Sequence, residues 1–326
     1  MITDIVVGLQ HGDEGKGKVA HHLLKSGEYT HCIRFNGGQN AGHTIYHKNK
    51  KFVTHIIPQG VFFGVRSIIG PGCVFNVEKL LKEIYELTEA GIDLGRNLKI
   101  AHNAHIILEH HILEDSKDVD VGTTKTGNGP AYRDKYYRQG IRAEQIPFLQ
   151  PFLIDIYEEL YNKDSVILME GAQGWMLDPD WGDYPYVTSS HTGVASALLN
   201  GVEPRSIRDV WGVGKIYETY VGKKDFQPPG DVFNKIQKAG SEFGATTGRV
   251  RQCNWLDFNN LRQAIHMNSV NKLVLNKVDI LREVGEWQIK NPDVTFNSEE
   301  EMRSFISENL SKDVENIFFS ESPKTI

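Results

Sequence analysis

The feature that most limits the fold of this chain is a short apolar run, residues 5–8 (Ile-Val-Val-Gly), followed by a glycine-rich segment, residues 12–18. β-Branched residues in such a run indicate a buried strand. The residues that follow, up to Leu24, can form a helix. A strand, a glycine loop and a helix in this order begin an α/β unit, so the start of the chain predicts an α/β fold.

The same alternation of strands and helices continues through most of the chain. Apolar residues at helical spacing follow Asn76, a suitable N-cap, and residues 153–160 form another candidate helix. Residues 166–169 and 273–275 are apolar runs typical of buried strands. We therefore expect residues 1–326 to form a single domain: a mostly parallel central sheet with flanking helices, similar to P-loop NTPases, with long loops at the active site.

Composition excludes several classes of protein. The chain has 36 Lys and Arg against 42 Asp and Glu, a net charge of −6, whereas a general nucleic-acid-binding protein needs a basic face. No apolar stretch approaches the roughly 18 residues of a membrane span, and the N-terminus does not read as a signal peptide. Cys32, Cys73 and Cys253 form no CxxC pair, as is typical of free thiols in a reducing compartment. We expect a cytoplasmic protein that binds neither nucleic acid nor membrane.

The glycine-rich loop suits phosphate binding, because glycines let backbone N–H groups approach an anion at the start of a helix. Asp13 within the loop can act as a base or contact Mg²⁺. The loop is not a Walker A motif, since Gln10 stands where that pattern has glycine and Gly17 where it has Ser or Thr. Taken alone, it also fits a plain turn with solvated charges. The residues predicted to bind a triphosphate here are Gly12, Gly15, Lys16, Gly17 and Lys18.

Two further loops combine small and polar residues. His43 lies among glycines and amides in residues 36–44, where it can reach a substrate as a general acid. Residues 122–130 gather hydroxyl groups and glycines suited to phosphate, with Arg138 among the basic residues beyond them. Each of these segments, taken alone, fits a solvated surface turn as well as it fits a binding site.

Polar segments in the second half of the chain suit other ligand groups. Residues 170–174 (Glu-Gly-Ala-Gln-Gly) follow a predicted strand directly, at the sheet edge where α/β proteins bind ligands. Arg249 and Arg251 stand in a loop of threonines and glycines and can bind a carboxylate. Asp279 can accept two hydrogen bonds from guanine, while the stem of Lys277 lies over the base. Taken alone, residues 276–279 favour an ordinary strand-to-helix turn with an N-cap aspartate over a base-binding site.

Each segment alone fits either a surface turn or a binding site, but the order and spacing of all of them favour a binding site. The motifs are Q-x-G-D-E-G-K-G-K from Gln10, N-A-G-H from Asn40, G-T-T from Gly122, E-G-A-Q-G from Glu170, Y-P-Y-V-T-S-S from Tyr184 and G-A-T-T-G-R from Gly244. Through them the chain resembles the adenylosuccinate synthetase family from Gly12 to Asp279. The resemblance implies a ligase that joins L-aspartate to the 6-position of a purine nucleotide, driven by a nucleoside triphosphate with Mg²⁺.

The resemblance also implies catalytic roles. Asp13 matches the base that takes the N1 proton of the purine, after which the 6-oxygen attacks the γ-phosphate of the triphosphate. His43 matches the acid that stabilises the transferring phosphoryl group, and Lys16 can neutralise phosphate charge. The amine of aspartate then displaces phosphate from the 6-phosphoryl intermediate. Asp13 and the carbonyl of Gly42 match the metal ligands.

The remaining matches concern binding. Arg138 matches an arginine that acts in the neighbouring subunit's site, which implies a homodimer. Lys277 and Asp279 match residues at the guanine of GTP. The residues that match binders of the purine monophosphate are Asn40, Thr124, Arg138, Gln173 and Thr188, and those that match the loop for aspartate and ribose are Thr247, Arg249 and Arg251.

Departures from the family pattern leave the substrates open. Val250 and Gln252 interrupt a run of arginines, and residues 320–323 replace a Gly-Pro element at the guanine site. IMP with GTP is the leading interpretation, because Asp13 and Asp279 are both kept. The alternative is a viral relative that makes 2-aminoadenylosuccinate from dGMP with ATP or dATP, which the compact length and the altered arginine loop favour.

A GTP-binding switch protein is an alternative of another class, and residues 276–279 (Asn-Lys-Val-Asp) are its main support. The failed Walker A pattern argues against it, because the Ser or Thr that holds Mg²⁺ is missing. Aspartate-dependent release of phosphate would separate a ligase from a switch. A binding module without catalysis is disfavoured, since Asp13 and His43 are both present.

Overall fold

A nine-stranded sheet forms the centre of the computed structural model, which describes residues 1–161, 164–244 and 248–326. Every pair of neighbouring strands in this sheet is parallel, which confirms the predicted α/β fold. In order across the sheet the strands are β17 (Asn316–Phe319), β14 (Lys272–Asn276), β11 (Ile207–Lys215), β1 (Ile2–Gly8), β10 (Val166–Glu170), β2 (His31–Arg34), β5 (Arg66–Ile69), β7 (Leu98–Ala101) and β9 (Leu153–Ile154).

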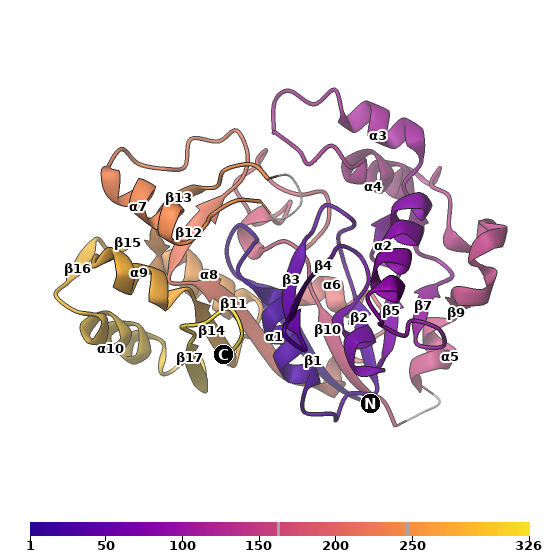
Figure 1. Cartoon of the computed structure of the whole chain (residues 1–326), viewed down its shortest axis with the longest axis horizontal. Coiled ribbons are helices and arrows are strands. Elements are labelled where there is room, and N and C mark those ends of the chain that lie inside the picture. The colour runs from indigo at the N-terminus through magenta and orange to yellow at the C-terminus, as the bar shows by residue number, and fades with distance from the viewer. Residues whose placement is uncertain (162–163, 245–247) are drawn as a thin grey trace.

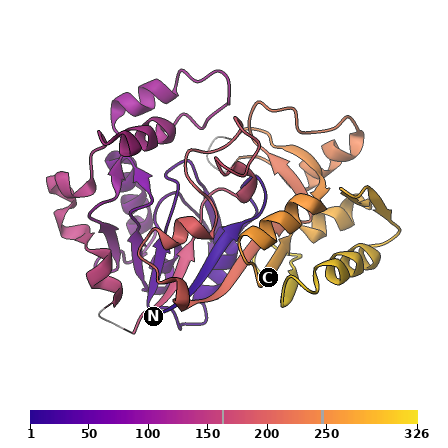
Figure 2. The ribbon, with the colours of Figure 1, turned by 180° about the vertical axis from the view of Figure 1, so that it is seen from behind.

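Helices cover both faces of this sheet. The helix α1 lies on the face seen in Figure 1, whereas α6 and α8 lie on the face seen in Figure 2. Burial on both faces explains why β1 is buried from its second residue onward, as its apolar run predicts. The helices are α1 (Lys16–Leu24), α2 (Val77–Glu89), α3 (Glu109–Asp115), α4 (Asn128–Tyr137), α5 (Ile156–Tyr161), α6 (Val194–Leu198), α7 (Asp231–Ala239), α8 (Phe258–Met267), α9 (Val278–Val284) and α10 (Glu299–Leu310).

The predicted start of the helix after Asn76 agrees with the structure, whereas the predicted start of the helix at residue 153 does not. The side chain of Asn76 accepts a hydrogen bond from the N–H of Lys79 at 3.1 Å, which confirms the predicted N-cap of α2. The prediction of a helix over residues 153–160 is wrong at its start. Its first residues form the edge strand β9, which pairs with β7, and Asp155 then accepts the N–H of Tyr157 at the beginning of α5.

Smaller sheets and 3-10 helices surround the central sheet. A four-stranded sheet beside α7 and α9 contains an antiparallel pair and was not predicted. Its strands are β12 (Tyr217–Tyr220), β13 (Gln252–Asp257), β15 (Trp287–Lys290) and β16 (Val294–Phe296); β3 (His43–His47) pairs with β4 (Lys50–Thr54) and β6 (Val74–Phe75) with β8 (His105–Ile106). The 3-10 helices are η1 (Gln59–Phe63), η2 (Ala143–Gln145), η3 (Pro147–Phe152), η4 (Trp175–Leu177) and η5 (Pro204–Ser206).

The parallel arrangement brings the functional loops together. All the strands of the central sheet point the same way, so the loops that follow β1, β10 and β14 emerge at one edge. Ligands of open α/β sheets bind at this edge. Among the described residues, no helix has both the length and the apolar character needed to cross a membrane.

Candidate active site

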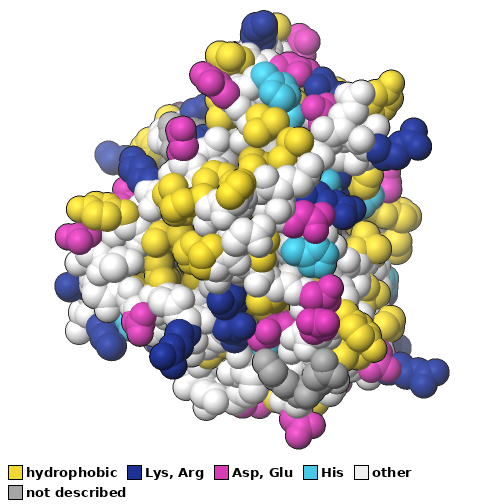
Figure 3. All heavy atoms as spheres, turned by 90° about the vertical axis from the view of Figure 1, so that its right-hand side faces the viewer, with side chains coloured by type: hydrophobic (Ala, Val, Ile, Leu, Met, Phe, Trp, Pro, Cys, Tyr) yellow, Lys and Arg dark blue, Asp and Glu magenta, His cyan; other side chains and the backbone are white. Residues whose placement is uncertain are grey.

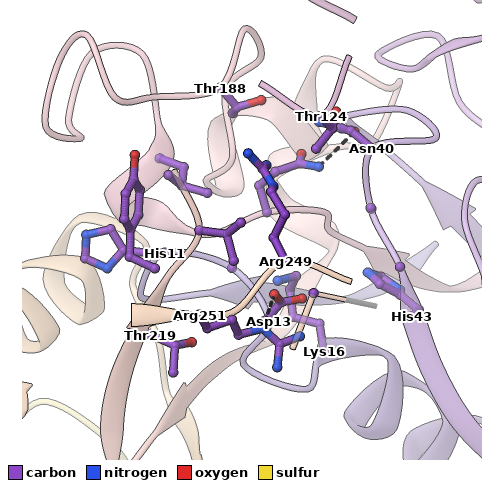
Figure 4. Close-up of a pocket in the computed structure, with 18 of the residues that line it drawn as sticks. His11, Asp13, Lys16, Asn40, His43, Thr124, Thr188, Thr219, Arg249 and Arg251 are labelled. Carbon is purple, nitrogen blue, oxygen red and sulfur yellow. Dashed lines mark hydrogen bonds and ion pairs between the residues drawn. The ribbon is translucent and has the colours of Figure 1, made fainter. Parts of the chain in front are cut away.

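A cavity of about 560 Å³ lies beyond the carboxyl ends of β1, β10 and β14, because residues that follow each of these strands line it. Loops from the hairpin β3–β4 and from residues 121–129 complete its walls. Figure 4 shows several of the predicted residues converging on this space. The predicted residues in its lining are Gly12, Asp13, Gly15, Lys16, Gly17, Asn40, Gly42, His43, Thr124, Gln173, Thr188, Arg249, Arg251 and Lys277.

The glycine loop is organised by a buried carboxylate, Glu14, to which the sequence analysis gave no role. One of its oxygens accepts the backbone N–H groups of Gln10 and Gly12, at 3.1 and 2.9 Å. The other oxygen lies 2.6 Å from the ammonium nitrogen of Lys16, which is itself buried. Gly15 has a φ of 98° and precedes α1 directly, a backbone conformation that side chains with a Cβ rarely adopt. Glu14 therefore fixes both the shape of the loop and the position of the Lys16 charge.

His43 begins β3 and belongs to a buried charge cluster. Its Nδ1 contacts Oε1 of Glu170, the last residue of β10, and the guanidinium of Arg34 lies 3.0 Å from its Nε2. Burial and the Arg34 charge lower the pKa of His43 to about 4, against the opposing effect of Glu170. Burial raises the pKa of Glu170, but Arg34 and His43 outweigh it and bring the value down to about 2. Glu170 thus holds a neutral His43 in one orientation.

Asp13 projects from the glycine loop, where its own φ is 60°. Its Oδ2 accepts a hydrogen bond from Nε of Arg251 at 2.8 Å, as Figure 4 shows. Another nitrogen of Arg251 donates to the buried carboxylate of Glu242 at 2.5 Å. Arg251 is therefore held between two carboxylates, one inside the protein and one in the cavity.

Glu242 is the centre of a second buried charge cluster. The hydroxyl of Tyr217 donates to it at 2.5 Å, and the ammonium groups of Lys215 and Lys277 lie 3.5 and 3.9 Å away. Burial acts to raise the pKa of Glu242, but the charges of Lys215, Arg251 and Lys277 outweigh burial and lower this pKa to about 2. Glu242 and Lys215 were not predicted, although an acid two residues before a loop of glycines, threonines and arginines was a usable signal for Glu242. The cluster joins the loop that carries Arg251 to the end of β14.

The opposite wall of the cavity is lined by neutral polar groups. The amide of Gln173 donates to Oδ1 of Asn40 at 3.1 Å, and Gln173 has a φ of 57° in the turn after β10. The hydroxyls of Thr124 and Thr126 are 2.9 Å apart, and the backbone N–H of Thr188 donates to Leu177 O at 2.7 Å. Amide and hydroxyl groups at such spacing suit the phosphate, ribose and base of a nucleotide.

Four predicted residues are absent from the described lining. The ammonium of Lys18 contacts the C-terminal segment instead, and Asp279 is half-buried in the first turn of α9. Arg138 is exposed where α4 ends, in a left-handed conformation with a φ of 68°. Thr247 lies outside the described residues.

The fold and the cavity together define an α/β enzyme that binds nucleotides at the carboxyl edge of a parallel sheet. The chain matches the sequence profile of the adenylosuccinate synthetase family over residues 5–153 and 147–315. It therefore belongs to the adenylosuccinate synthetase family, nucleotide-binding ligases of purine biosynthesis that form a carbon–nitrogen bond and use a metal ion.

Named relatives agree with this assignment. The chain is 36% identical to the adenylosuccinate synthetase of Thermodesulfovibrio yellowstonii and 37% identical to that of Salinibacter ruber, in each case over 89% of this chain and 80% of the relative. The fully ligated adenylosuccinate synthetase of Plasmodium falciparum has a TM-score of 0.86 at 27% identity, with 98% of this chain and 97% of that chain covered.

A viral enzyme shares the fold at lower identity. The succinoaminodeoxyadenylate synthetase of cyanophage S-2L, bound to dGMP and to dATP as energy donor, has a TM-score of 0.79 at 21% identity. The match covers 99% of this chain and 93% of the viral one. Similarity at this level concerns the fold.

Proposed function

We propose that this protein joins L-aspartate to the 6-position of IMP at the expense of GTP, giving adenylosuccinate, GDP and phosphate. The observation that carries the proposal is that Asp13 and His43 line one cavity together with Lys16. Gly17 of α1 packs closely on His43: a Cβ added to it would lie 2.8 Å from the Cβ of His43. The candidate base and acid thus belong to segments in direct contact.

The first step moves a proton and a phosphoryl group. Asp13 accepts the N1 proton of the purine, and the 6-oxygen forms a bond to the γ-phosphorus while the bond to the diphosphate breaks. His43 donates a hydrogen bond to the phosphoryl oxygens once it is protonated, and Glu170 stabilises that protonated form. Lys16 supplies positive charge to the phosphates.

The second step forms the carbon–nitrogen bond. The amine of aspartate attacks C6 of the phosphorylated purine, phosphate leaves with the 6-oxygen, and the nitrogen loses a proton. Arg249 and Arg251 line the cavity and bind the carboxylates of aspartate and the ribose, as we propose also for Thr247. Asn40, Thr124, Gln173 and Thr188 hold the purine monophosphate on the opposite wall.

We propose Mg²⁺ as the metal ion. The carboxylate of Asp13 and the carbonyl of Gly42 line the same cavity, and hard oxygen ligands of this kind suit Mg²⁺. When bound, Mg²⁺ would draw negative charge from the phosphate oxygens. Asp13 also holds Arg251, so its carboxylate must be shared or released when substrates enter.

For the donor, we propose that the glycine loop and α9 bind GTP. Gly12, Gly15, Lys16 and Gly17 line the cavity where we place the phosphates, and Lys277 lines the same cavity. Asp279, in the first turn of α9, accepts the N1–H and 2-amino hydrogens of guanine.

We also propose that the chain is a single domain that works as a homodimer. Strands from both ends of the chain, β1 and β17, belong to one sheet, which supports a single domain. Arg138 is exposed beside Tyr136 and Tyr137, whose exposures are 67% and 66%, and such a surface suits a second copy. Apolar side chains also gather on the face in Figure 3, where β9 and α5 lie.

A phosphate-release assay tests the proposed function. IMP, dIMP, GMP and dGMP are each combined with GTP, ATP and dATP, with and without L-aspartate. We expect aspartate-dependent release that is fastest with IMP and GTP. Faster release with dGMP and ATP or dATP would instead support the activity of the viral relative. Hydrolysis of GTP at the same rate with and without L-aspartate would support a switch protein.

A further inference from the structure

Lys18 lies on α1, two residues beyond Lys16, but unlike Lys16 it does not belong to the described lining of the cavity. It donates hydrogen bonds to Oγ of Ser320 at 2.6 Å, to the carbonyl of Ser322 at 3.0 Å and to that of Thr325 at 3.2 Å. An ammonium group has three hydrogens, and each has an acceptor here. Lys18 therefore has no donor left for a phosphate unless it releases the segment 320–326.

That segment lies beside the donor site that we propose for the glycine loop and α9. Pro323 lines the cavity together with Lys277. The carbonyl of Ser320 accepts the N–H of Val278, the first residue of α9, at 3.3 Å, and the N–H of Ser320 donates to Leu275 O at 2.8 Å. The segment is thus joined to the turn that carries Lys277 and Asp279, the proposed readers of the donor base.

The fold of the segment depends on the same contacts. The hydroxyl of Ser320 donates to the carbonyl of Thr325 at 2.7 Å, and Ser322 forms a bridge with Thr325. Lys18 reaches the centre of this loop, because all three of its acceptors belong to it. Lys324 lies over the ring of Tyr46, 5.6 Å from its centroid, in the hairpin that begins at His43. Figure 1 shows the end of the chain beside α1 and this hairpin.

The charges around Lys18 agree with an internal role. Burial lowers its pKa to about 8, while Asp279 acts in the opposite direction and Lys277 in the same one. The carboxylate of Asp279 therefore lies close enough to stabilise the ammonium form. The side chain lies between the proposed base reader and the C-terminal segment.

We propose that Lys18 is a positioning residue that latches the segment 320–326 against α9, and so builds the base wall of the triphosphate site without touching the phosphates. This inference rests on the proposed function, because the donor site is part of it. It replaces the expectation from the sequence that Lys18 binds the triphosphate directly. It predicts that loss of Lys18 weakens donor binding and leaves the chemical step and the other substrates alone.

The test compares Lys18→Met with the wild type, using Lys25→Met as the matched control. Lys25 follows the same helix and is exposed. We expect the KM for GTP, and its Kd measured without monophosphate, to rise about tenfold, because the charge-assisted hydrogen bonds that hold the segment 320–326 are lost. The kcat and the KM values for monophosphate and aspartate should change less than about twofold. Hydrogen exchange in residues 320–326 should be faster in Lys18→Met only.

Ser320→Ala provides a second variant that leaves α1 intact, and it should raise the Kd for GTP and the exchange rate in the same direction. An unchanged Kd, unchanged exchange, or a large fall in kcat with an unchanged Kd would each overturn the latch. The proposed function fails separately, if the wild type releases no aspartate-dependent phosphate with any substrate pair. In that case the latch is still tested by comparing hydrogen exchange and the Kd values for GTP, ATP and dATP between the wild type and the two variants.

Discussion

Arg251 donates from Nε to Oδ2 of Asp13 across 2.8 Å, while its terminal nitrogen is held by the buried Glu242. The candidate base is therefore ion-paired with an arginine of the same cavity. Glu242 keeps Arg251 in place from the protein interior, so Asp13 is the partner free to turn toward a purine. The negative charge that aspartate or phosphate brings can take the place of Asp13 beside Arg251, which leaves Asp13 to accept the N1 proton.

Replacement of this base should stop the reaction without unfolding the protein. We expect Asp13→Asn to lower kcat by ~10²–10⁴-fold, the usual cost of losing a positioned general base. The Tm should stay within a few degrees, because Asp13 lies at the surface of the cavity. Asp293→Asn, at an exposed position, serves as the control. Near-normal turnover in Asp13→Asn would remove this residue from the mechanism.

Base selectivity should depend on Asp279. A carboxylate accepts both N1–H and the 2-amino hydrogens of guanine, whereas adenine offers a lone pair at N1. We expect Asp279→Asn to lower the ratio of kcat/KM for GTP over ATP by roughly ten- to a hundredfold, since an unpaired polar group costs about 1–3 kcal/mol. A wild type that prefers ATP or dATP, or a variant with the same ratio, would show that Asp279 does not read the base.

Mixed dimers can test whether Arg138 works in the neighbouring subunit. Arg138→Ala and Asp13→Ala should each be nearly inactive alone. After the two are mixed and allowed to exchange subunits, one site of each mixed dimer regains both residues, so about a quarter of wild-type activity should return. Mixing Asp13→Ala with His43→Ala controls for nonspecific effects, because both residues act in the same subunit. No recovery in the first mixture, or an active monomer in sedimentation velocity, would contradict this prediction.

The stability of the protein should depend on pH through Glu218. Burial in β12 and the nearby Asp257 raise the pKa of this carboxyl to about 7, although Lys290 opposes them. Between pH 4.5 and 7 the folded chain thus binds a proton that the unfolded chain has lost. This contribution is fully present below about pH 4.5 and is lost as pH rises through 7.

Glu218→Gln keeps a neutral group at this position, so its Tm should fall less than that of the wild type as pH rises from 4.5 to 8. The measurement is thermal unfolding by circular dichroism across this range. Glu286→Gln, at an exposed position, should follow the wild-type profile. Parallel profiles for Glu218→Gln and the wild type would show that Glu218 does not titrate in this window.

Much of the fold could be predicted from the sequence, because several of its elements are determined by residues that are neighbours in the chain. The apolar run of β1, the glycines after it and the cap at Asn76 each act over a few positions. Residues 153–154 were wrongly predicted as helical because a strand of two residues is too short to show an alternating apolar pattern. Its structure is determined by pairing with β7. The antiparallel pair β12–β13 depends on contacts that no local pattern reveals.

The candidate site divides in the same way. Glycine loops and single acids or bases could be predicted, whereas the partners that set their charge could not. Glu242 meets Lys215 and Tyr217 only after the sheet has formed, so the sequence does not show which groups surround its carboxylate. Lys18 looks like a phosphate ligand beside Lys16 until the position of Ser320 is known.

The contact between Lys18 and Ser320 joins positions 302 residues apart, which has a consequence for synthesis on the ribosome. The glycine loop is made first and its base wall last. A nascent chain can pair β1 with β10 and β11 long before residue 320 leaves the exit tunnel. A chain that has not yet released residue 320 would thus have the glycine loop without the proposed base wall, so the donor site is completed late in synthesis.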